Sequence, residues 1–103
     1  MAMVLTKDTF ETEVMEAKSK VLIDFWAPRC MPCRMLTPVI EELSQTLDGR
    51  VKVCKVNVDE QPELAVKFGV MSIPMLVVME NGEVTAKEVG LMPKADILKM
   101  LGE

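Results

Sequence analysis

Two cysteines, Cys30 and Cys33, stand two residues apart in the segment APRCMPCRM, residues 27–35. Thiols at this spacing suit three kinds of chemistry: half of a metal site, a structural disulfide, or a pair that is reversibly oxidised and reduced. A zinc site normally takes four ligands from Cys and His. The chain has three cysteines and no histidine, so a metal site would need carboxylates or a second molecule. These counts favour the redox pair.

The 103 residues of the chain are enough for one domain, which we expect to span residues 1–103. The net charge of −4 comes from scattered acids and bases, which disfavours a nucleic-acid surface or a basic membrane patch. No apolar run approaches the roughly 20 residues of a membrane span, and residues 1–10 lack the pattern of a secretory signal. We therefore expect a cytoplasmic protein, in a compartment where structural disulfides are rare.

The first half of the chain alternates between helical and strand patterns. A helix is predicted at 6–18, with Asp8 as its cap and Glu11 completing a capping box. Residues 21–27 form a short apolar run typical of a strand buried on both faces. A helical stripe follows over 31–47, and Pro38 is expected to kink it. Residues 51–59 alternate β-branched side chains and predict a strand.

The second half predicts a short helix at 61–69, a hairpin turning at Asn81-Gly82 and a final helix at 93–103. Alternating strands and helices indicate an α/β fold with a mainly parallel central sheet, covered by helices on both faces, and the hairpin as an antiparallel edge.

In this fold, Cys30 lies at the start of a helix, where free backbone N–H groups and a partial positive charge stabilise a thiolate. Cys33 lies one turn inside, close enough to attack a mixed disulfide formed by Cys30. Pro32 is tolerated in a first turn.

The chain resembles the thioredoxin family along nearly its whole length. The resemblance is carried by VLIDFWAPRCMPCRMLTPV, KVNVDEQPELAVKFGV, SIPML and NGEV followed by EVG. It implies a thioredoxin fold, with a mixed central sheet between helices, and a monomeric protein-disulfide reductase with no metal or bound organic cofactor. Cys30 would be the nucleophile and Cys33 the resolving thiol. Its partners would be protein disulfide substrates and a flavoenzyme similar to thioredoxin reductase that restores the dithiol.

Asp24 interrupts the buried run VLIDF, and a buried carboxyl group has a raised pKa. It would accept the proton of Cys33 when that thiol resolves the mixed disulfide; the alternative is an acid at a strand edge that reaches solvent. Lys55 matches the family's buried lysine near this aspartate, and would otherwise be an ordinary solvated lysine. Trp26 matches the tryptophan that packs beside the active site, a role compatible with a plain core aromatic.

The resemblance also implies a surface that faces the substrate. Pro74 matches the family's cis-proline, which lies against the cysteine pair and presents backbone to a substrate chain. The other residues expected on or beside this surface are Trp26, Arg29, Met31, Pro32, Met71, Ile73, Gly90 and Leu91.

Two residues depart from the family pattern Trp-Cys-Gly-Pro-Cys. Arg29 replaces the tryptophan, and a cation beside Cys30 is expected to favour its thiolate unless water screens the charge. Met31 replaces the glycine, and with Met71 it suggests a methionine-lined docking patch, since methionine surfaces adapt to varied partners. Met15, Met35, Met79 and Met100 are instead expected in the core, as is Cys54, an inert small residue on a buried strand.

Other functions remain open at this point. The same chemistry at a higher potential would make an oxidant or isomerase, because the residues between and beside the cysteines shift the dithiol–disulfide equilibrium. A non-catalytic binding subunit with incidental cysteines is a second alternative. A metal-bound dimer through two Cys-x-x-Cys pairs is a distant third.

Overall fold

The apolar run that follows Lys20 forms the central strand of a five-stranded sheet. In a computed structural model that describes residues 1–103, β2 (Lys20–Trp26) lies between β3 (Val51–Asn57) and β4 (Met75–Glu80). The short β1 (Met3–Val4) and the longer β5 (Glu83–Val89) form the two edges, in the order β1-β3-β2-β4-β5. The thioredoxin-type mixed sheet expected from the resemblance is confirmed.

The strand directions differ from the mainly parallel sheet that the sequence pattern predicts. β1 and β2 run parallel to β3, whereas β4 is antiparallel to β2 and β5 is antiparallel to β4. The connection between β3 and β4, which contains the six-residue α2 (Pro62–Lys67), joins the carboxyl end of β3 to the start of β4 at the same edge of the sheet. β4 therefore runs opposite to β2 and β3.

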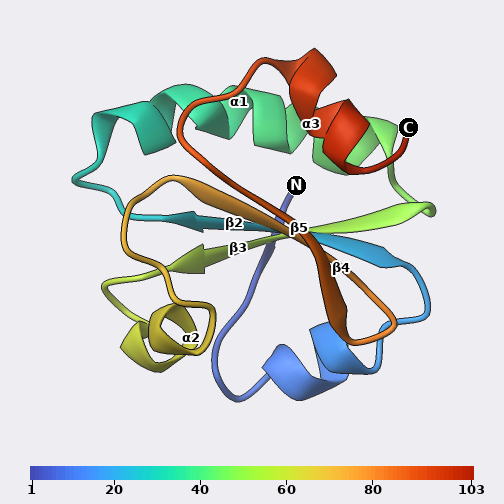
Figure 1. Cartoon of the computed structure of the whole chain (residues 1–103), viewed down its shortest axis with the longest axis horizontal. Coiled ribbons are helices and arrows are strands. Elements are labelled where there is room, and N and C mark those ends of the chain that lie inside the picture. The colour runs from blue at the N-terminus through green and yellow to red at the C-terminus, as the bar shows by residue number, and fades with distance from the viewer.

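Helices cover both faces of the sheet (Figure 1). The sixteen-residue α1 (Met31–Thr46) and α3 (Lys94–Met100) lie on one face, and α2 lies on the other with a short π-helix, η1 (Glu11–Met15). No helix is long and apolar enough to cross a membrane. The α1 face of the core is built mainly from Leu22, Leu36, Ile40, Leu43, Val53, Leu76, Val78, Ile97 and Leu101. The α2 face is built mainly from Phe10, Val14, Ile23, Phe25, Cys54, Val56, Leu64, Phe68, Met75 and Val77.

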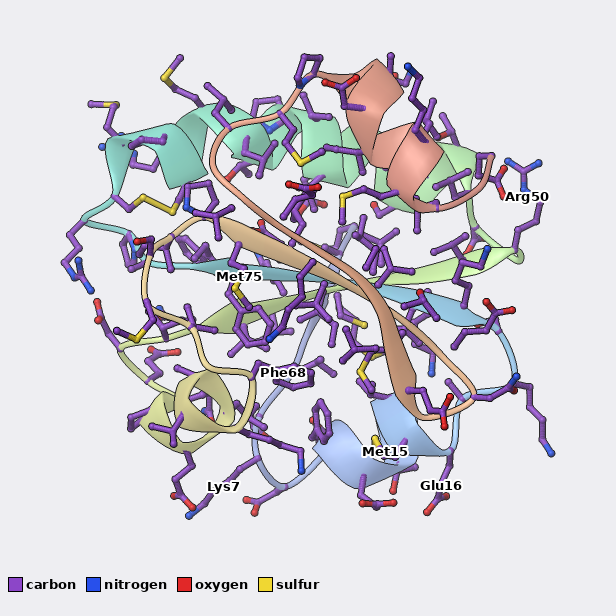
Figure 2. The ribbon with its side chains drawn as sticks, viewed as in Figure 1. Lys7, Met15, Glu16, Arg50, Phe68 and Met75 are labelled. Carbon is purple, nitrogen blue, oxygen red and sulfur yellow. A yellow bond between two sulfur atoms is a disulfide. The ribbon has the colours of Figure 1, made fainter.

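Phe68 joins α2 to the sheet on the second face. Its ring centroid lies 5.2 Å from that of Phe25 on β2 and 5.6 Å from that of Phe10 before η1. Figure 2 shows Phe68 and Met75 between the sheet and α2. Gly69 then ends the helical segment at a φ of 64°, a left-handed conformation that glycine adopts without steric cost.

The first helical segment is shorter than the predicted helix at 6–18, because it spans only Glu11–Met15. The Thr6 N–H donates to Thr9 Oγ1 at 3.0 Å, and the Phe10 N–H donates to the Thr6 carbonyl at 3.0 Å. Thr9 Oγ1 thus accepts a backbone N–H in the way expected of Glu11, two residues earlier in the chain, and no side chain caps the helical segment, so the prediction of an Asp8 cap is wrong. Farther on, the Glu16 N–H donates to the Glu11 carbonyl, the five-residue spacing of a π-helix.

The hairpin and the long helix are confirmed. Asn81 and Gly82 connect β4 to β5 with φ angles of 54° and 77°, the two positive values that a tight type I′ turn requires. α1 continues through Pro38 as one helix. Ile97 and Leu101 of the final helical segment are buried against the sheet.

Candidate functional site

Cys30 and Cys33 meet where β2 leads into α1. Cys30 is the residue that caps α1, and Pro32 occupies its first turn. The two cysteines form a disulfide, with Cα atoms 5.3 Å apart, seen as a yellow bond in Figure 2. The Cys33 N–H donates to Cys30 Sγ at 3.2 Å. Cys33 is fully buried and Cys30 is half-buried, so Cys30 is the sulfur that an incoming molecule can reach.

The loop before β4 lies against this disulfide. The Ile73–Pro74 peptide bond is cis, and the Ile73 carbonyl oxygen lies 3.8 Å from Cys30 Sγ. The Gly90 N–H donates to the Pro74 carbonyl at 2.8 Å, which ties the end of β5 to the same loop. Gly90 has a φ of 105°, a conformation that residues with a side chain rarely adopt. Segments from three parts of the sequence thus meet at Cys30.

Asp24 is buried in the middle of β2, with 3% of its surface exposed. It stands two residues after Leu22, whose side chain lies in the α1 face of the core, so Asp24 points toward the helix that carries Cys33. Its Oδ1 atom has no hydrogen-bond partner. Burial raises the pKa of Asp24 to about 7, while Lys55 lowers it and Glu41 raises it further. The carboxyl group can therefore take up and release a proton near neutral pH.

Lys55 stands directly beside Asp24 in the pairing of β2 with β3. Its ammonium group forms no ion pair with Asp24: Nζ lies 4.0 Å from Glu41 Oε2 of α1 and 5.3 Å from the centroid of the Trp26 ring. The sequence places Lys55 and Trp26 in this neighbourhood but does not reveal Glu41. Nothing in its sequence context distinguishes Glu41 from the adjacent Glu42.

Arg29 is paired with an acid that the sequence did not single out. Its Nε and Nη2 atoms donate to the two carboxylate oxygens of Asp59 at 3.1 and 3.0 Å. The hydrogen bond and the charge of Asp59 raise the pKa of Arg29, so the guanidinium stays protonated. The sequence did contain one indication of this pairing. Asp59 follows β3 and Arg29 follows β2, and these two neighbouring parallel strands end at the same edge of the sheet.

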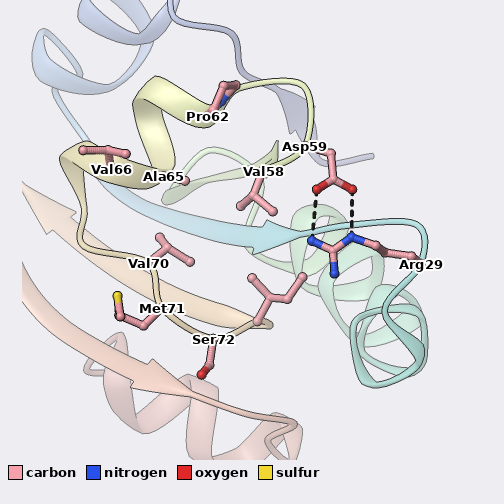
Figure 3. Close-up of a pocket in the computed structure, with 10 residues that line it drawn as sticks. Arg29, Val58, Asp59, Pro62, Ala65, Val66, Val70, Met71 and Ser72 are labelled. Atoms are coloured by element: carbon pink, nitrogen blue, oxygen red, sulfur yellow. Dashed lines mark hydrogen bonds and ion pairs between the residues drawn. The ribbon is translucent and has the colours of Figure 1, made fainter.

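A pocket of about 380 Å³ opens next to this ion pair, between α2 and the loop before Pro74 (Figure 3). Six of its ten lining residues are hydrophobic, and the Arg29–Asp59 pair forms a charged part of its rim. The structure brings Arg29, Met71 and Ile73 together around this pocket, whereas Met31, Pro32, Gly90 and Leu91 lie outside its lining. The remaining lining residues are Val58, Pro62, Ala65, Val66, Val70 and Ser72.

One of the methionines predicted to lie in the core is exposed instead. Met31, Met71 and Leu91 are exposed, and Met71 is the most open, with 93% of its surface accessible. Met15, Met79 and Met100 are buried or half-buried, as expected. Met35 is not: it is 58% exposed, so its assignment to the core is wrong. The inward face of α1 is occupied by Cys33, Leu36 and Ile40, which turns Met35 outward.

Cys54 is buried on β3 and forms no disulfide. Burial raises its pKa to about 12, so it remains a thiol at neutral pH. No group of three or more His, Cys, Asp or Glu side chains gathers in a way that could hold a metal ion.

Comparison with known proteins agrees with this geometry. The sequence model of the thioredoxin family matches residues 1–103. A thioredoxin from Rickettsia bellii is 46% identical, covering 98% of this chain and 96% of the relative. Thioredoxin 1 from a Nostoc species is 43% identical, covering 94% and 91%. A thioredoxin from Rickettsia felis is 43% identical, covering 100% and 98%.

Family membership and the paired cysteines make the chain a thiol–disulfide oxidoreductase. The family consists of protein-disulfide reductases, which implies protein substrates and a reductase partner. The half-buried Cys30 and the buried Cys33 supply the redox-active disulfide. The chain belongs to the thioredoxin family.

Proposed function

We propose that Cys30 is the nucleophile and Cys33 the resolving thiol. The Cys30 thiolate attacks one sulfur of a substrate disulfide, forms a mixed disulfide and releases the other substrate sulfur as a thiolate. Cys33 then loses its proton and attacks Cys30 Sγ, which releases the second substrate thiolate. The substrate disulfide gains two electrons and the Cys30–Cys33 dithiol loses them. The observation that carries this order is the burial difference: Cys30 is half-buried and Cys33 is fully buried.

Asp24 is the proton acceptor in the second step. Cys33 must become a thiolate inside the protein, and the chain contains no histidine that could take its proton. Asp24 lies on the α1 side of β2, and burial raises its pKa to about 7. A carboxyl group with a pKa near the working pH is matched to general base catalysis. Lys55 modulates Asp24 through its positive charge, which lowers that pKa.

The substrate chain docks on the surface around Cys30. The hydrogen bond from the Gly90 N–H to the Pro74 carbonyl supports a backbone platform beside the nucleophile. The pocket next to Arg29 is open to a side chain of the substrate near its disulfide. Met31 and Leu91, which follow Cys30 and Gly90 in the chain, add exposed apolar side chains to this surface. Trp26 packs below this surface, where Lys55 contacts its ring.

Residues 1–103 act as one domain and as a monomer. In support of this, the cysteines, the cis-proline loop and the pocket all come from a single chain built on one sheet. A flavoenzyme similar to thioredoxin reductase restores the dithiol after each cycle. The working compartment is the cytoplasm, since repeated disulfide reduction requires a reducing environment. No bound cofactor takes part in the exchange, because both electrons come from the two thiols.

A trapping experiment tests the roles of the two cysteines. Cys33→Ser should accumulate a covalent complex with a disulfide-containing protein, released by dithiothreitol, because the resolving thiol is missing. Cys30→Ser should form none and should lose reductase activity. Cys54→Ala, which changes a buried thiol away from the site, serves as the control and should retain activity. Trapping by Cys30→Ser instead of Cys33→Ser would reverse the assignment.

A further inference from the structure

Glu41 lies on α1, the helix that begins at the redox site, and its carboxylate is held at two points. Its Oε1 atom accepts the Ala2 N–H at 2.9 Å, and its Oε2 atom lies 4.0 Å from Lys55 Nζ. The side chains of Glu41 and Lys55 expose only 28% and 23% of their surfaces. Glu41 therefore has little freedom to leave Lys55, and water screens the pair less than it screens a surface pair.

The position of Lys55 is unexpected for a lysine that stands beside a buried carboxylate. Lys55 and Asp24 are direct partners across β2 and β3, yet Asp24 Oδ1 has no hydrogen-bond partner. The ammonium group instead lies between Glu41 and the Trp26 ring. Two attractive contacts thus hold the cation, which forms no ion pair with the carboxyl group.

We propose that Glu41 is a positioning residue that acts on Asp24 through Lys55: by binding the Lys55 ammonium group, it keeps the Asp24 carboxylate without a cationic partner. This inference rests on the proposed role of Asp24 as proton acceptor. An Asp24 directly paired with Lys55 would hold its charge too well to take up the proton of Cys33. Glu41 therefore keeps Asp24 basic enough for the resolving step.

The other elements around Asp24 offer no competing charge at close range. Lys55 comes from β3 and Glu41 from α1, and both act on the pKa of Asp24 in the expected directions. From β4, the residue opposite Asp24 is the apolar Leu76. From β5, the exposed Glu88 lies one strand farther away, opposite Leu76. Glu41 is thus the one nearby anion that both repels a charge on Asp24 and binds its neighbouring cation.

The substitution Glu41→Gln tests the inference directly, because the amide oxygen of glutamine can still accept the Ala2 N–H while its charge is lost. The measurement is a carbon-13 NMR titration of the Asp24 carboxyl group in the oxidised protein. Glu41→Gln should lower the Asp24 pKa by about one pH unit, the effect of a single charge at short range. The matched control is Glu42→Gln, which removes the same charge from the next residue of α1, where Glu42 pairs with Lys94. It should leave the titration of Asp24 unchanged.

A double-mutant cycle with Lys55→Met separates positioning from direct repulsion. If Glu41 acts through Lys55, Glu41→Gln should lower the Asp24 pKa more in the native background than in Lys55→Met. Equal effects in the two backgrounds would show only direct repulsion and overturn the inference. So would an unchanged titration in Glu41→Gln, or the same shift in Glu42→Gln.

The rate of resolution distinguishes this inference from the proposed function. In single turnovers followed by Trp26 fluorescence, the midpoint of the pH profile for Cys30–Cys33 closure should move down together with the Asp24 titration. If the titration moves and the profile does not, Asp24 is not the proton acceptor, while the control of Asp24 by Glu41 stands. If neither moves, the positioning role itself is refuted.

Discussion

Arg29 and Asp59 form a two-point ion pair beside Cys30, with Nε–Oδ2 and Nη2–Oδ1 distances of 3.1 and 3.0 Å. The sequence alone suggested an isolated cation that favours the Cys30 thiolate. In the folded protein the carboxylate of Asp59 offsets most of that charge. The pair acts on Cys30 as a local dipole at the rim of the pocket, and the two residues are expected to have opposite effects on its reactivity.

Removing either charge should therefore change the reactivity of Cys30, and removing both should restore it. Alkylation of the reduced protein at pH 6 should be slower in Arg29→Gln and faster in Asp59→Asn, each by about threefold, as expected for a partly screened surface charge. The variant that carries both substitutions should be alkylated at a rate close to that of the native protein. Salt at 1 M should erase the differences, since the Debye length is then about 3 Å. Equal slowing in both single variants would point to a structural effect instead.

The buried Asp24 should make the oxidised protein less stable as the pH rises. Its pKa is about 7 in the folded protein and 3.8 in the unfolded chain, so the folded state binds the proton more tightly. Stability from this group is fully present below about pH 4 and is lost between pH 4 and pH 7. Relative to Asp24→Asn, the native free energy of unfolding should fall by about 4 kcal/mol from pH 4 to pH 8.

Urea denaturation of the oxidised native protein and of Asp24→Asn at the two pH values measures this difference. The asparagine variant removes the titration, and comparing each protein with itself at two pH values cancels the fixed effect of the amide. A difference that stays constant between pH 4 and pH 8 would mean that Asp24 titrates near its ordinary value.

The exposed methionines should affect protein substrates and spare small ones. Replacing Met31 and Met71 together by serine removes apolar surface worth about 1 kcal/mol, so the KM for a protein disulfide should rise about fivefold. The KM for a small-molecule disulfide should not change, because such a substrate contacts only Cys30 and its immediate surroundings. Val84→Ser removes an exposed apolar side chain from the far end of β5 and serves as the control. Equal effects on both substrates would refute the docking patch.

Cys54 should be chemically silent in the folded protein. Burial raises its pKa to about 12, and the thiolate is the form that reacts. In a Cys30→Ser, Cys33→Ser variant, iodoacetamide at pH 8 should leave the native protein unmodified and should label Cys54 only after unfolding in guanidinium. Mass spectrometry then counts the cysteines that iodoacetamide has alkylated. Labelling of the native protein at the unfolded rate would show that β3 opens readily.

The Cys30–Cys33 pair should be reducing. An oxidant requires a strongly stabilised thiolate, and the cation next to Cys30 is already paired with Asp59. We expect an equilibrium potential below about −230 mV, at the reducing end of the range of thiol–disulfide oxidoreductases, where thioredoxins lie. Titration in a thiol redox buffer, followed by Trp26 fluorescence, gives the value. A potential near −120 mV, typical of a strong disulfide oxidant, would contradict a reductase and indicate an oxidant or isomerase.

Local patterns predicted the elements and the chemistry well. The Asn81-Gly82 turn, the buried strand before Cys30 and the helix that begins there all depend on neighbouring residues, and all are present. The errors came where local signals compete. Thr9 accepts the Thr6 N–H and Asp8 caps no helix, because several residues in this segment have suitable side chains and the chain geometry chooses between them. The two-residue β1 is too short to leave a pattern.

The sequence by itself determined the reacting groups, their order along the chain and the family, because these depend on residue types and short spacings. Only the tertiary structure decided the electrostatic environment of those groups. Arg29 meets Asp59 across 30 positions, and Lys55 turns to Glu41 in place of its strand neighbour Asp24. To predict such contacts, one must know the register of β2 and β3 and the rotation of α1 about its axis. Salt screens interactions between exposed charges beyond about 8 Å at physiological ionic strength, so the three-dimensional placement of each side chain decides them.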